Sequence, residues 1–382
     1  MARHLADAGI GRDDIVAVHA ERNAGLAWAM LGVLKAGAAF MLLDPAHPAA
    51  RSAQCLLQAR PRARLRLDTG GGLPPALEAA LRELPIVASA DWRAVRGSPQ
   101  AAWRECSAQP PDRAVAAVDL AYVAFTSGST GEPKAIAGTH SPLTHFFEWH
   151  GRQWSLQPGD RFSVLSGLGH DPLLRDVLGA LWLGASCWMP ESGRMGDPGY
   201  PATWMSGAGI TVSHLTPAMA ELIAARETDS PPTVLPALRH VFCGGEALRA
   251  VTVDTLRRLA PAAQWVNYYG ATETPQAMGW HAVAPSLAAD ALPVPIGRGI
   301  DDVQLLVLNE SGQLAGIGEL GEIHVRTPYL ARGYLHDAAE TGRRFVPAPQ
   351  PCDARDRMYR TGDLGRYRPD GEVDHAGRRD GQ

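Results

Sequence analysis

Lysine and cysteine are scarce in this chain, and long apolar runs are missing from it. Only Lys35 and Lys134 are lysines, so the other 34 of the 36 basic residues are arginine. The five cysteines are scattered, with no pair at Cys-X-X-Cys spacing, which argues against a zinc site or a disulfide framework. No stretch approaches the ~20 apolar residues of a membrane-spanning helix, and the N-terminus has no signal-peptide core. We therefore expect a reduced, cytoplasmic compartment.

The overall charge balance is close to neutral. The 382 residues carry a formal net charge of -4, which leaves no electrostatic footprint for nucleic acid or an anionic membrane. We expect neither as a partner, and the one basic stretch, 60–66, is interpreted as a solvated face or loop. With 46% hydrophobic residues, the chain can bury a sizeable core or two to three subdomains that share one.

Strand-like and helical apolar patterns alternate over most of the chain. This alternation predicts an α/β fold with layered sheets and packed helices. The expected strands cover 39–43, 120–125, 162–165, 185–189, 211–215, 240–243 and 265–268. Helical patterns include 26–34, 172–183, 217–225 and 248–259. Gly37 stands where a glycine can end the first of these helices.

The pattern changes near Pro293. Short strand candidates follow at 303–308, 322–325, 358–360 and 365–368. Turn signals such as Glu310-Ser311-Gly312 and Pro369-Asp370-Gly371 separate them. We therefore expect α/β subdomains over 1–292 and a β-rich, barrel-like subdomain over 293–376.

An anion-binding loop is predicted directly after the strand 120–125. The segment 126–134, TSGSTGEPK, holds four hydroxyls, two glycines and Lys134. Glycines let the backbone approach an anion, amides and hydroxyls donate hydrogen bonds, and the lysine supplies positive charge. The spacing is not that of a Walker A loop. An ordinary Gly/Ser surface loop is the alternative, which the preceding strand and the rare lysine disfavour.

Further motifs follow this loop in a fixed order. They are LKAGAAFMLLDP (34–45), GHDPLLRDVLGALWLGA (169–185), FCGGEAL (242–248), NYYGATET (267–274), GELGEIHVRTPYLARGY (318–334), YRTGDL (359–364) and GRRDGQ (377–382). Together with TSGSTGEPK, the series resembles the adenylate-forming superfamily of acyl-CoA synthetases, luciferases and peptide-synthetase adenylation domains. It is most similar to the adenylation domain of a nonribosomal peptide synthetase, and the resemblance spans almost the whole chain.

The resemblance implies a fold and a reaction. The fold is the large N-terminal core of an adenylating enzyme. In the reaction a carboxylate attacks the α-phosphate of ATP with Mg²⁺, releasing pyrophosphate and leaving an acyl-adenylate. Such a step depends on charge neutralisation and in-line placement. An aminoacyl-adenylate would then be loaded onto the phosphopantetheine of a partner carrier domain, beside other synthetase domains.

The resemblance also assigns residues to the nucleotide. The β- and γ-phosphates fall to Thr126, Ser127, Gly128, Ser129, Thr130, Gly131 and Lys134. Glu273 should ligate magnesium, because a hard cation prefers carboxylate oxygen, and Thr272 should donate to the α-phosphate. Adenine and ribose fall to Gly245, Glu246, Asn267, Tyr269, Asp363 and Arg378. The catalytic candidates are Lys134, Thr272, Glu273 and His170.

The resemblance places Asp171 where amino-acid-activating members pair an aspartate with the substrate's α-ammonium group. The alternative is that Asp171 only caps the helix that follows it. His170 departs from the Phe or Tyr usual at its position and keeps an aryl- or acyl-acid ligase open as an alternative. The other pocket candidates are Pro172, Arg175, His214, Phe242, Gly244, Tyr268, Gln276 and Ala277. Their polarity suggests a polar or acidic substrate side chain, although Arg175 can equally point to solvent.

The family comparison also predicts what the chain lacks. The first family motif is missing, and 377–382 match the start of the hinge that precedes a small C-terminal domain, with Asp380 at the hinge position. That domain carries a lysine that stabilises charge during adenylation, so we expect the isolated chain to adenylate weakly. A nucleotide-binding core without chemistry is the remaining alternative.

Overall fold

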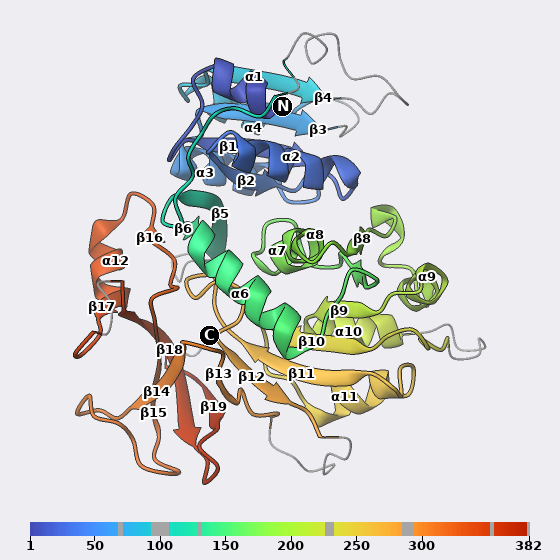
Figure 1. Ribbon diagram of the computed structural model, residues 1–382, viewed down its shortest axis with the longest axis vertical. Coiled ribbons are helices and arrows are strands. Elements are labelled where there is room, and N and C mark those ends of the chain that lie inside the picture. The colour runs from blue at the N-terminus through green and yellow to red at the C-terminus, as the bar shows by residue number, and fades with distance from the viewer. Residues whose placement is uncertain are drawn as a thin grey trace. The chain divides into compact units, whose positions relative to one another are not determined.

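The computed structural model describes residues 1–67, 72–92, 107, 109–127, 132–225, 233–284, 293–351 and 355–379, with only the backbone given at 92, 127 and 192 (Figure 1). The chain forms two compact units. The first comprises Met1–Leu143, Gly167–Asp171 and Ala331–Glu340. The second comprises Thr144–Ser166, Pro172–Leu330 and Thr341–Gln382. The division predicted at 292/293 separates an α/β region from a β-rich region, not these two compact units, and it stays a prediction.

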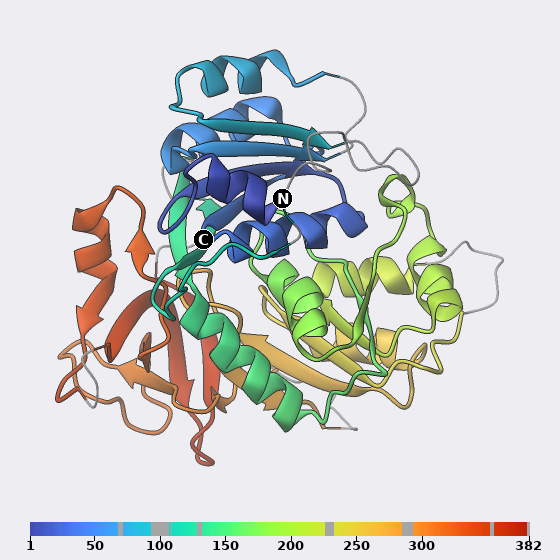
Figure 2. The same cartoon turned by 45° about the horizontal axis from the view of Figure 1, so that its top comes forward.

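The first unit is built on a seven-stranded sheet. Its strand order is β16 (Gly333–Tyr334), β6 (Pro133–Thr139), β5 (Leu120–Ser127), β2 (Ala39–Leu43), β1 (Ile15–Ala20), β3 (Ala63–Leu67) and β4 (Ala88–Trp92). Strands β5, β2, β1, β3 and β4 pair in parallel, whereas β6 and β16 are added antiparallel. Helices cover both faces: α1 (Ala2–Asp7) and α2 (Ala24–Lys35) on one side, α3 (Ala49–Ala59) and α4 (Pro75–Arg82) on the other (Figure 2).

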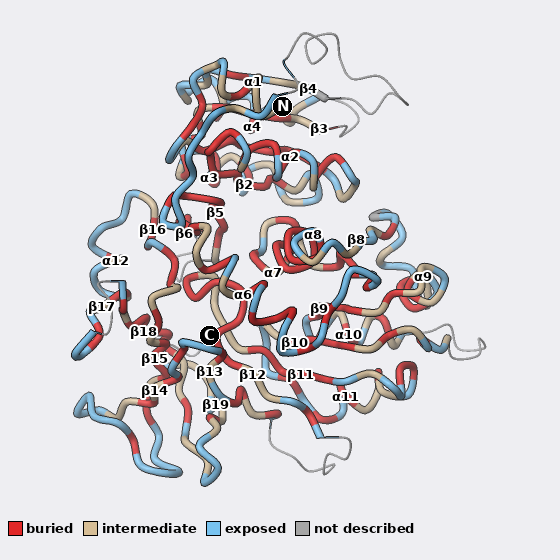
Figure 3. The backbone as a smooth tube through the Cα atoms, in the orientation of Figure 1, coloured by how far each residue is buried: buried red, intermediate tan, exposed pale blue. Residues whose placement is uncertain are grey.

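Coverage on both faces explains the apolar character of the central strands. Every residue of β1 and β2 is buried, as Figure 3 shows for this part of the chain. A strand buried on both faces reads as a continuous apolar run, so the predicted strand 39–43 matches β2. Helix α2 begins where the Asn23 side chain accepts a hydrogen bond from the Gly25 amide. It ends before Gly37, whose φ of 77° is the left-handed value that favours glycine.

Strands β5 and β6 pair in an antiparallel hairpin and include the first and last residues of the predicted phosphate-loop segment 126–134. The pairing extends to Thr126 opposite Lys134. Within the hairpin Tyr122 lies opposite Gly138, and its ring fills the space above that glycine. A Cβ atom at Gly138 would lie 2.1 Å from the ring, so only glycine fits there. Gly138 thus leaves room for the Tyr122 ring on this face of the sheet.

The second unit contains a mostly parallel sheet. Its order is β13 (Arg298–Gly299), β12 (Gly279–Ala282), β11 (Gln264–Tyr269), β10 (His240–Gly244), β9 (Val212–Leu215), β7 (Arg161–Ser163) and β8 (Ser186–Trp188). The helices α9 (Tyr200–Ala208), α10 (Pro217–Ala224) and α11 (Ala250–Arg257) contribute apolar residues to a core that includes Trp265. Helix α6 (His140–Gln153) has residues in both units.

The predicted helix 172–183 is not a regular α-helix. It consists of a short turn, α7 (Pro172–Leu174), a π-helical segment, Arg175–Gly179, and a second turn, α8 (Ala180–Trp182). A π-helical turn inserts an extra residue into the helix and changes which side chains face inward. Here both Arg175 and Asp176 are buried, although they are neighbours in sequence.

The C-terminal strands form an antiparallel sheet in the second unit. Its order is β14 (Gln304–Leu308), β15 (Gly321–Thr327), β18 (Arg357–Tyr367) and β17 (Phe345–Pro347), with β19 (Val373–Arg378) also paired to β18. This confirms the β-rich region, but the sheet stays open across the described part of the chain. The two strands predicted at 358–360 and 365–368 are one long strand. A register shift and the positive φ of Gly362 bend β18 between them, which explains the gap in the sequence pattern.

Candidate functional site

In the second unit, three residues predicted to hold the ribose and the adenine base meet at the bend of β18. The Tyr269 hydroxyl donates to Asp363 Oδ2 at 2.7 Å, and Arg378 Nη1 donates to Asp363 Oδ1 at 3.0 Å. Desolvation, and next the Asp363 carboxylate, raise the pKa of Tyr269 well above its usual value of 10, so the phenol keeps its proton. Each carboxylate oxygen has a second lone pair with which to accept from a hydroxyl of a ligand.

Asn267 lies on β11, two residues before Tyr269. Its side-chain nitrogen donates to the carbonyl oxygens of Val294 at 3.2 Å and Pro295 at 2.8 Å. The amide orientation is therefore determined, and the side-chain oxygen is the atom that can accept from an amino group of a base. Gly244 on the neighbouring strand has no room for a side chain, because a Cβ would lie 2.9 Å from the Tyr268 carbonyl oxygen. Gly245 and Glu246 follow it on an exposed segment.

The turn after β11 carries the predicted magnesium ligand. The Thr274 hydroxyl accepts from the Ala271 amide at 2.8 Å and so closes the turn around Glu273. Glu273 is 7% exposed and Thr272 is half-buried. No group of three or more His, Cys, Asp or Glu side chains in the described ranges is arranged to hold a metal. One carboxylate still suits Mg²⁺, which proteins commonly bind through one or two carboxylates together with substrate phosphates.

Gln276, in the same turn, has an unusual backbone. Its φ is 72°, in the left-handed region that non-glycine residues avoid, and its side chain is buried. Conformations of this kind cost on the order of 1–3 kcal/mol and collect at functional sites. Ala277, the next pocket candidate, is fully buried.

In the first unit, Lys134 lies near the start of β6 and makes an ion pair. Its Nζ lies 2.8 Å from Glu340 Oε1 and 5.3 Å from the centre of the Tyr334 ring. Thr126 is the paired residue across the hairpin. Four predicted phosphate ligands, Gly128, Ser129, Thr130 and Gly131, lie outside the described residues, and the Ser127 side chain does as well.

His170 and Asp171 also belong to the first unit. Asp171 is 8% exposed, and its charge contributes, after desolvation, to raising the pKa of the buried Tyr122 hydroxyl. His170 is exposed, and its ring lies over Gly167, where a Cβ would approach to 2.8 Å. Asp171 is thus a buried carboxylate, whereas His170 is an exposed residue whose imidazole pKa is lowered chiefly by desolvation.

The substrate-pocket candidates of the second unit gather around two stacked rings. Phe242 and Tyr268 are nearly parallel, with ring centres 5.0 Å apart, and His214 stacks on Phe242 at 5.1 Å. The Arg175 guanidinium lies 5.8 Å from the Tyr268 ring centre, within cation–π range. Arg175 is only 7% exposed, so it does not point to solvent. Pro172, which starts the segment, is half-buried.

A buried chain of hydrogen bonds runs through this group and includes residues that the motifs did not indicate. His214 Nδ1 lies 2.8 Å from Asp176 Oδ1, and His214 Nε2 lies 3.3 Å from His150 Nε2. His150 Nδ1 lies 2.8 Å from the Tyr268 hydroxyl, which also accepts from Trp154 Nε1 at 2.8 Å. We call these five residues the buried chain. Asp176 stands beside Arg175 in its motif, but nothing in the sequence indicated His150 or Trp154.

When Asp176 carries its negative charge, the direction of each hydrogen bond in the buried chain is determined. An ionised Asp176 can only accept, so His214 donates from Nδ1 and accepts at Nε2. His150 then donates from Nε2 and accepts at Nδ1 from Tyr268, and the Trp154 indole can only donate. Both imidazoles are neutral in this arrangement. Desolvation first, and then the charge of Arg175 among others, lower the pKa values of His150 and His214 well below 6.5.

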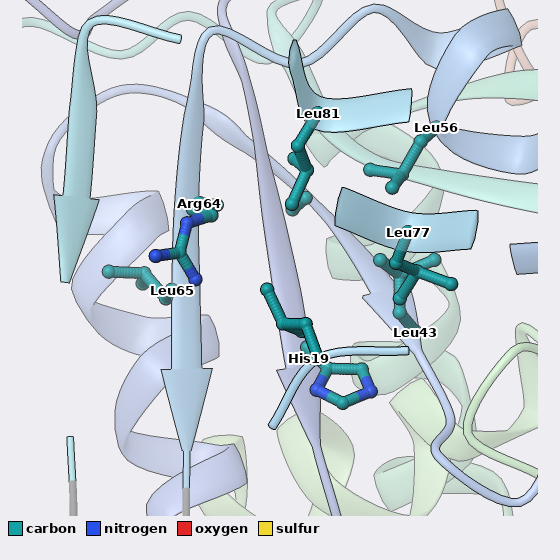
Figure 4. A pocket seen from close by; sticks show the side chains of 9 residues that line it. His19, Leu43, Leu56, Arg64, Leu65, Leu77 and Leu81 are labelled. Carbon is teal, nitrogen blue, oxygen red and sulfur yellow. The ribbon is translucent and has the colours of Figure 1, made fainter. Parts of the chain in front are cut away.

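A small apolar hollow in the first unit is separate from these residues. It is lined by Ala17, His19, Leu43, Leu56, Arg64, Leu65, Leu73, Leu77 and Leu81 (Figure 4). His19 Nδ1 has no hydrogen-bond partner among the described atoms, and desolvation lowers its pKa. None of the predicted site residues lines the hollow, so it is not the candidate site.

A comparison with protein families decides the class of this protein. A family model described as AMP-binding enzyme matches residues 1–335. The chain belongs to the AMP-binding enzyme family. The resemblance indicated by the motifs is thereby confirmed, and so is the mixed α/β fold with its three sheets.

Curated relatives of this chain include reductases and a peptide synthase. L-2-aminoadipate reductase of Schizosaccharomyces pombe is 36% identical over 425 residues, and that of Saccharomyces cerevisiae is 36% identical over 429. A linear gramicidin synthase polypeptide of Brevibacillus parabrevis is 34% identical over 388 residues. All of this chain is aligned in each case, but it spans only 30% of the two reductases and 5% of the synthase polypeptide.

Solved structures of AMP-binding relatives share the fold. The nonribosomal peptide synthetase FmoA3 (S1046A) has a TM-score of 0.84 and 27% identity, covering 99% of this chain and 39% of that one. The same protein is known in α-methyl-L-serine-AMP-bound and AMPPNP-bound forms. CmiS6 has a TM-score of 0.81 and 26% identity, covering 99% of this chain and 87% of its own. No helix in the described ranges is long and apolar enough to cross a membrane.

Proposed function

We propose that this AMP-binding enzyme activates an amino acid as its aminoacyl-adenylate at the expense of ATP. The observation that carries the proposal is the cluster of Tyr269, Asp363 and Arg378. Three separate segments bring a protonated phenol, a carboxylate and a guanidinium together at one bend. The carboxylate can accept from both hydroxyls of a ribose, and the arginine can reach the ribose or a phosphate.

The remaining nucleotide roles are proposed for the other motif residues. Lys134 neutralises charge on the β- and γ-phosphates, with the hydroxyls and amides of 126–131 as further donors. Thr272 donates to the α-phosphate, and Glu273 holds the magnesium ion. Bound magnesium would neutralise phosphate charge. Asn267 accepts from the adenine amino group, while Gly245 and Glu246 cover the base.

An amino-acid substrate is supported by Asp171. A carboxylate that is 8% exposed is a suitable partner for an α-ammonium group, because partial desolvation strengthens their attraction. The names of the relatives also point to amino acids: L-2-aminoadipate, the gramicidin peptide and α-methyl-L-serine-AMP. The rival substrate class, an aryl or acyl acid, rests on His170, an exposed residue.

The side chain of the amino acid is proposed to be acidic. Arg175 is a buried cation beside Tyr268 and Phe146. His150 and His214 are neutral, so among Arg175 and these two histidines the positive charge that can face a ligand is the guanidinium. A buried guanidinium can bind a carboxylate through two parallel hydrogen bonds. Relatives that act on L-2-aminoadipate, an amino acid with a second carboxyl group, are consistent with this choice.

The product is proposed to pass to a carrier domain that bears phosphopantetheine. The relatives among the synthetases are much longer than this chain and contain it as a small part. Carrier loading and contact with other synthetase domains are therefore proposals for the larger assembly in which such a chain works.

A thermal-shift screen with non-hydrolysable acyl-sulfamoyl adenosines tests the proposal. At about 100 times its Kd, a ligand adds about 2.7 kcal/mol of stability, which is readily seen. We expect glutamyl and aminoadipyl mimics to stabilise the chain more than leucyl, aryl or fatty-acyl mimics. If an acidic mimic stabilises the chain no more than the leucyl mimic, the proposal of an acidic side chain is wrong. If aryl or fatty-acyl mimics stabilise it most, the proposal of an amino-acid substrate is wrong.

Asp171→Ala separates the two substrate classes. If Asp171 binds the α-ammonium group, the variant loses the thermal shift with every aminoacyl mimic. Its melting temperature without ligand should equal that of the wild type without ligand. If the substrate is a simple acid, the variant retains its shift with aryl or fatty-acyl mimics. A chain that binds no adenosine derivative at all would be a core without this chemistry.

A further inference from the structure

The first unit holds Lys134 in an ion pair that the proposed function does not use. Lys134 is the last residue of the predicted phosphate-loop segment 126–134 and the second residue of β6. Its ammonium lies 2.8 Å from the Glu340 carboxylate, and the two side chains are 31% and 10% exposed. The pair joins residues that lie 206 positions apart in the sequence.

Glu340 is placed by a segment that attaches to the phosphate-loop hairpin. Strand β16 adds to the free edge of β6, with Tyr334 opposite Ile136. The Leu335 amide then donates to the Ala135 carbonyl oxygen at 2.8 Å, one residue from Lys134. Helix α12 (Ala338–Arg344) begins next, and the Asp337 side chain accepts from the Glu340 amide at 2.8 Å. The carboxylate is therefore held against β6 by backbone pairing rather than by chance surface contact.

The chemistry of this pair conflicts with phosphate binding. A carboxylate next to the ammonium cancels most of the positive potential that would attract a triphosphate. An incoming phosphate oxygen must compete with Glu340 for the same ammonium, and it is repelled by the carboxylate. The pair is partly exposed, so the exchange does not require a buried charge to be uncovered.

We propose that Glu340 is the resting counter-ion of Lys134, and that the terminal phosphates of ATP displace it. Glu340 then pairs with Lys134 again when pyrophosphate leaves, which favours release of that product. The proposal rests on the proposed function, since it takes Lys134 as a ligand of the β- and γ-phosphates. Glu340 acts through Lys134 and is a positioning residue.

The test is Glu340→Gln, which keeps the shape and a hydrogen-bond acceptor but removes the charge. We expect the Kd values for ATP and for pyrophosphate, measured by titration calorimetry with Mg²⁺, to fall about fivefold. The Kd for AMP, which lacks the two terminal phosphates, should not change. A structural role for Glu340 would shift all three ligands together. Unchanged or weaker ATP binding in the variant would overturn the proposal.

Two further variants make the test specific. Glu340→Asp keeps the charge, so its ATP affinity should stay within about twofold of the wild type; a gain equal to that of Glu340→Gln would contradict the role of charge. Glu78→Gln is the matched control, because it removes the carboxylate of another ion pair of this unit, with Arg82 on α4. It should leave all three Kd values unchanged.

The gain must also depend on Lys134. In a Lys134→Gln background, Glu340→Gln should no longer tighten ATP or pyrophosphate binding, and a gain that persists would overturn the proposal. Wild-type chain that binds neither ATP nor AMP would instead contradict the proposed function. The two failures are thus distinguishable in one set of titrations.

Discussion

The Lys134–Glu340 pair and the buried chain both link polar groups that are far apart in the sequence, but the pair can be exchanged for a ligand whereas the buried chain holds a fixed geometry. The pair is partly exposed and charged, and a ligand with more negative charge can break it. The buried chain has five members in the interior, and each donor in it has an acceptor. The comparison shows how burial decides the use of polar groups: exposed charge can be exchanged, whereas a satisfied interior network holds its geometry.

The strongest way to break the comparison is to remove the acceptor that ends the buried chain. Asp176→Ala leaves the His214 Nδ1–H without its partner in a site closed to water. We expect the free energy of unfolding of the second unit to fall by about 3 kcal/mol, measured by urea denaturation. The control Asp197→Ala breaks an exposed pair with Arg194 and should change it by less than about 0.5 kcal/mol. Equal effects would mean that the interior network adds no stability.

A smaller effect is expected in the middle of the chain. Tyr268→Phe removes one hydroxyl, so His150 Nδ1 and the Trp154 indole both lose a hydrogen-bond partner. The expected loss is about 2 kcal/mol in the same denaturation experiment. Tyr200→Phe is the matched control, because its hydroxyl accepts one exposed hydrogen bond from the Glu191 amide. A Tyr268→Phe protein as stable as wild type would show that the chain is not continuous.

The pH dependence of stability tests whether the two imidazoles are neutral. Burial lowers the pKa values of His150 and His214 in the folded state, so below pH 6.5 the unfolded chain binds more protons. Stability is therefore full above pH 6.5 and falls as pH decreases, by up to about 1.4 kcal/mol per pH unit for each histidine. His214→Gln should reduce the slope of the free energy of unfolding against pH by the contribution of one histidine between about pH 6.5 and 5.

The smallest effect on stability is expected at the exchangeable pair. Glu340→Gln should change the free energy of unfolding by less than about 1 kcal/mol, because the lysine is about a third exposed and already well hydrated. Thermal melting without ligand provides the measurement. A loss as large as that of Asp176→Ala would show that the two regions do not differ in the way described, and that Glu340 serves the fold.

Much of the local structure could be predicted from the sequence. Strand β2 and helix α10 match their predicted ranges closely, because apolar periodicity and the end signals of a helix are short-range properties. Long strands with internal bends were harder. The bend in β18 at Gly362 divides one strand into two patterns, and only its pairing with β15 and β19 reveals the single element.

The candidate site was predicted only in part, because motifs are local whereas the contacts between them depend on the tertiary structure. The motifs predicted Tyr269, Asp363 and Arg378 as nucleotide ligands, which stays a prediction, and the fold brings these three side chains together. His150 and Trp154 were missed, since they lie on or just after α6 in a stretch with no motif, and their role depends on the facing strands β9 and β11. The burial of Arg175 was undecided by the sequence, because a π-helical turn determines which way it faces.

The sequence by itself determined the family and the alternation of strands and helices, and it predicted the phosphate loop that carries Lys134. These properties depend on neighbouring residues and on motif order. Only the tertiary structure decided the partners of the charged and titratable groups. Lys134 finds Glu340 because β16 adds to the edge of β6, and His214 finds Asp176 because a π-helical turn faces β9. Such pairs depend on strand order and helix geometry, which no local pattern encodes.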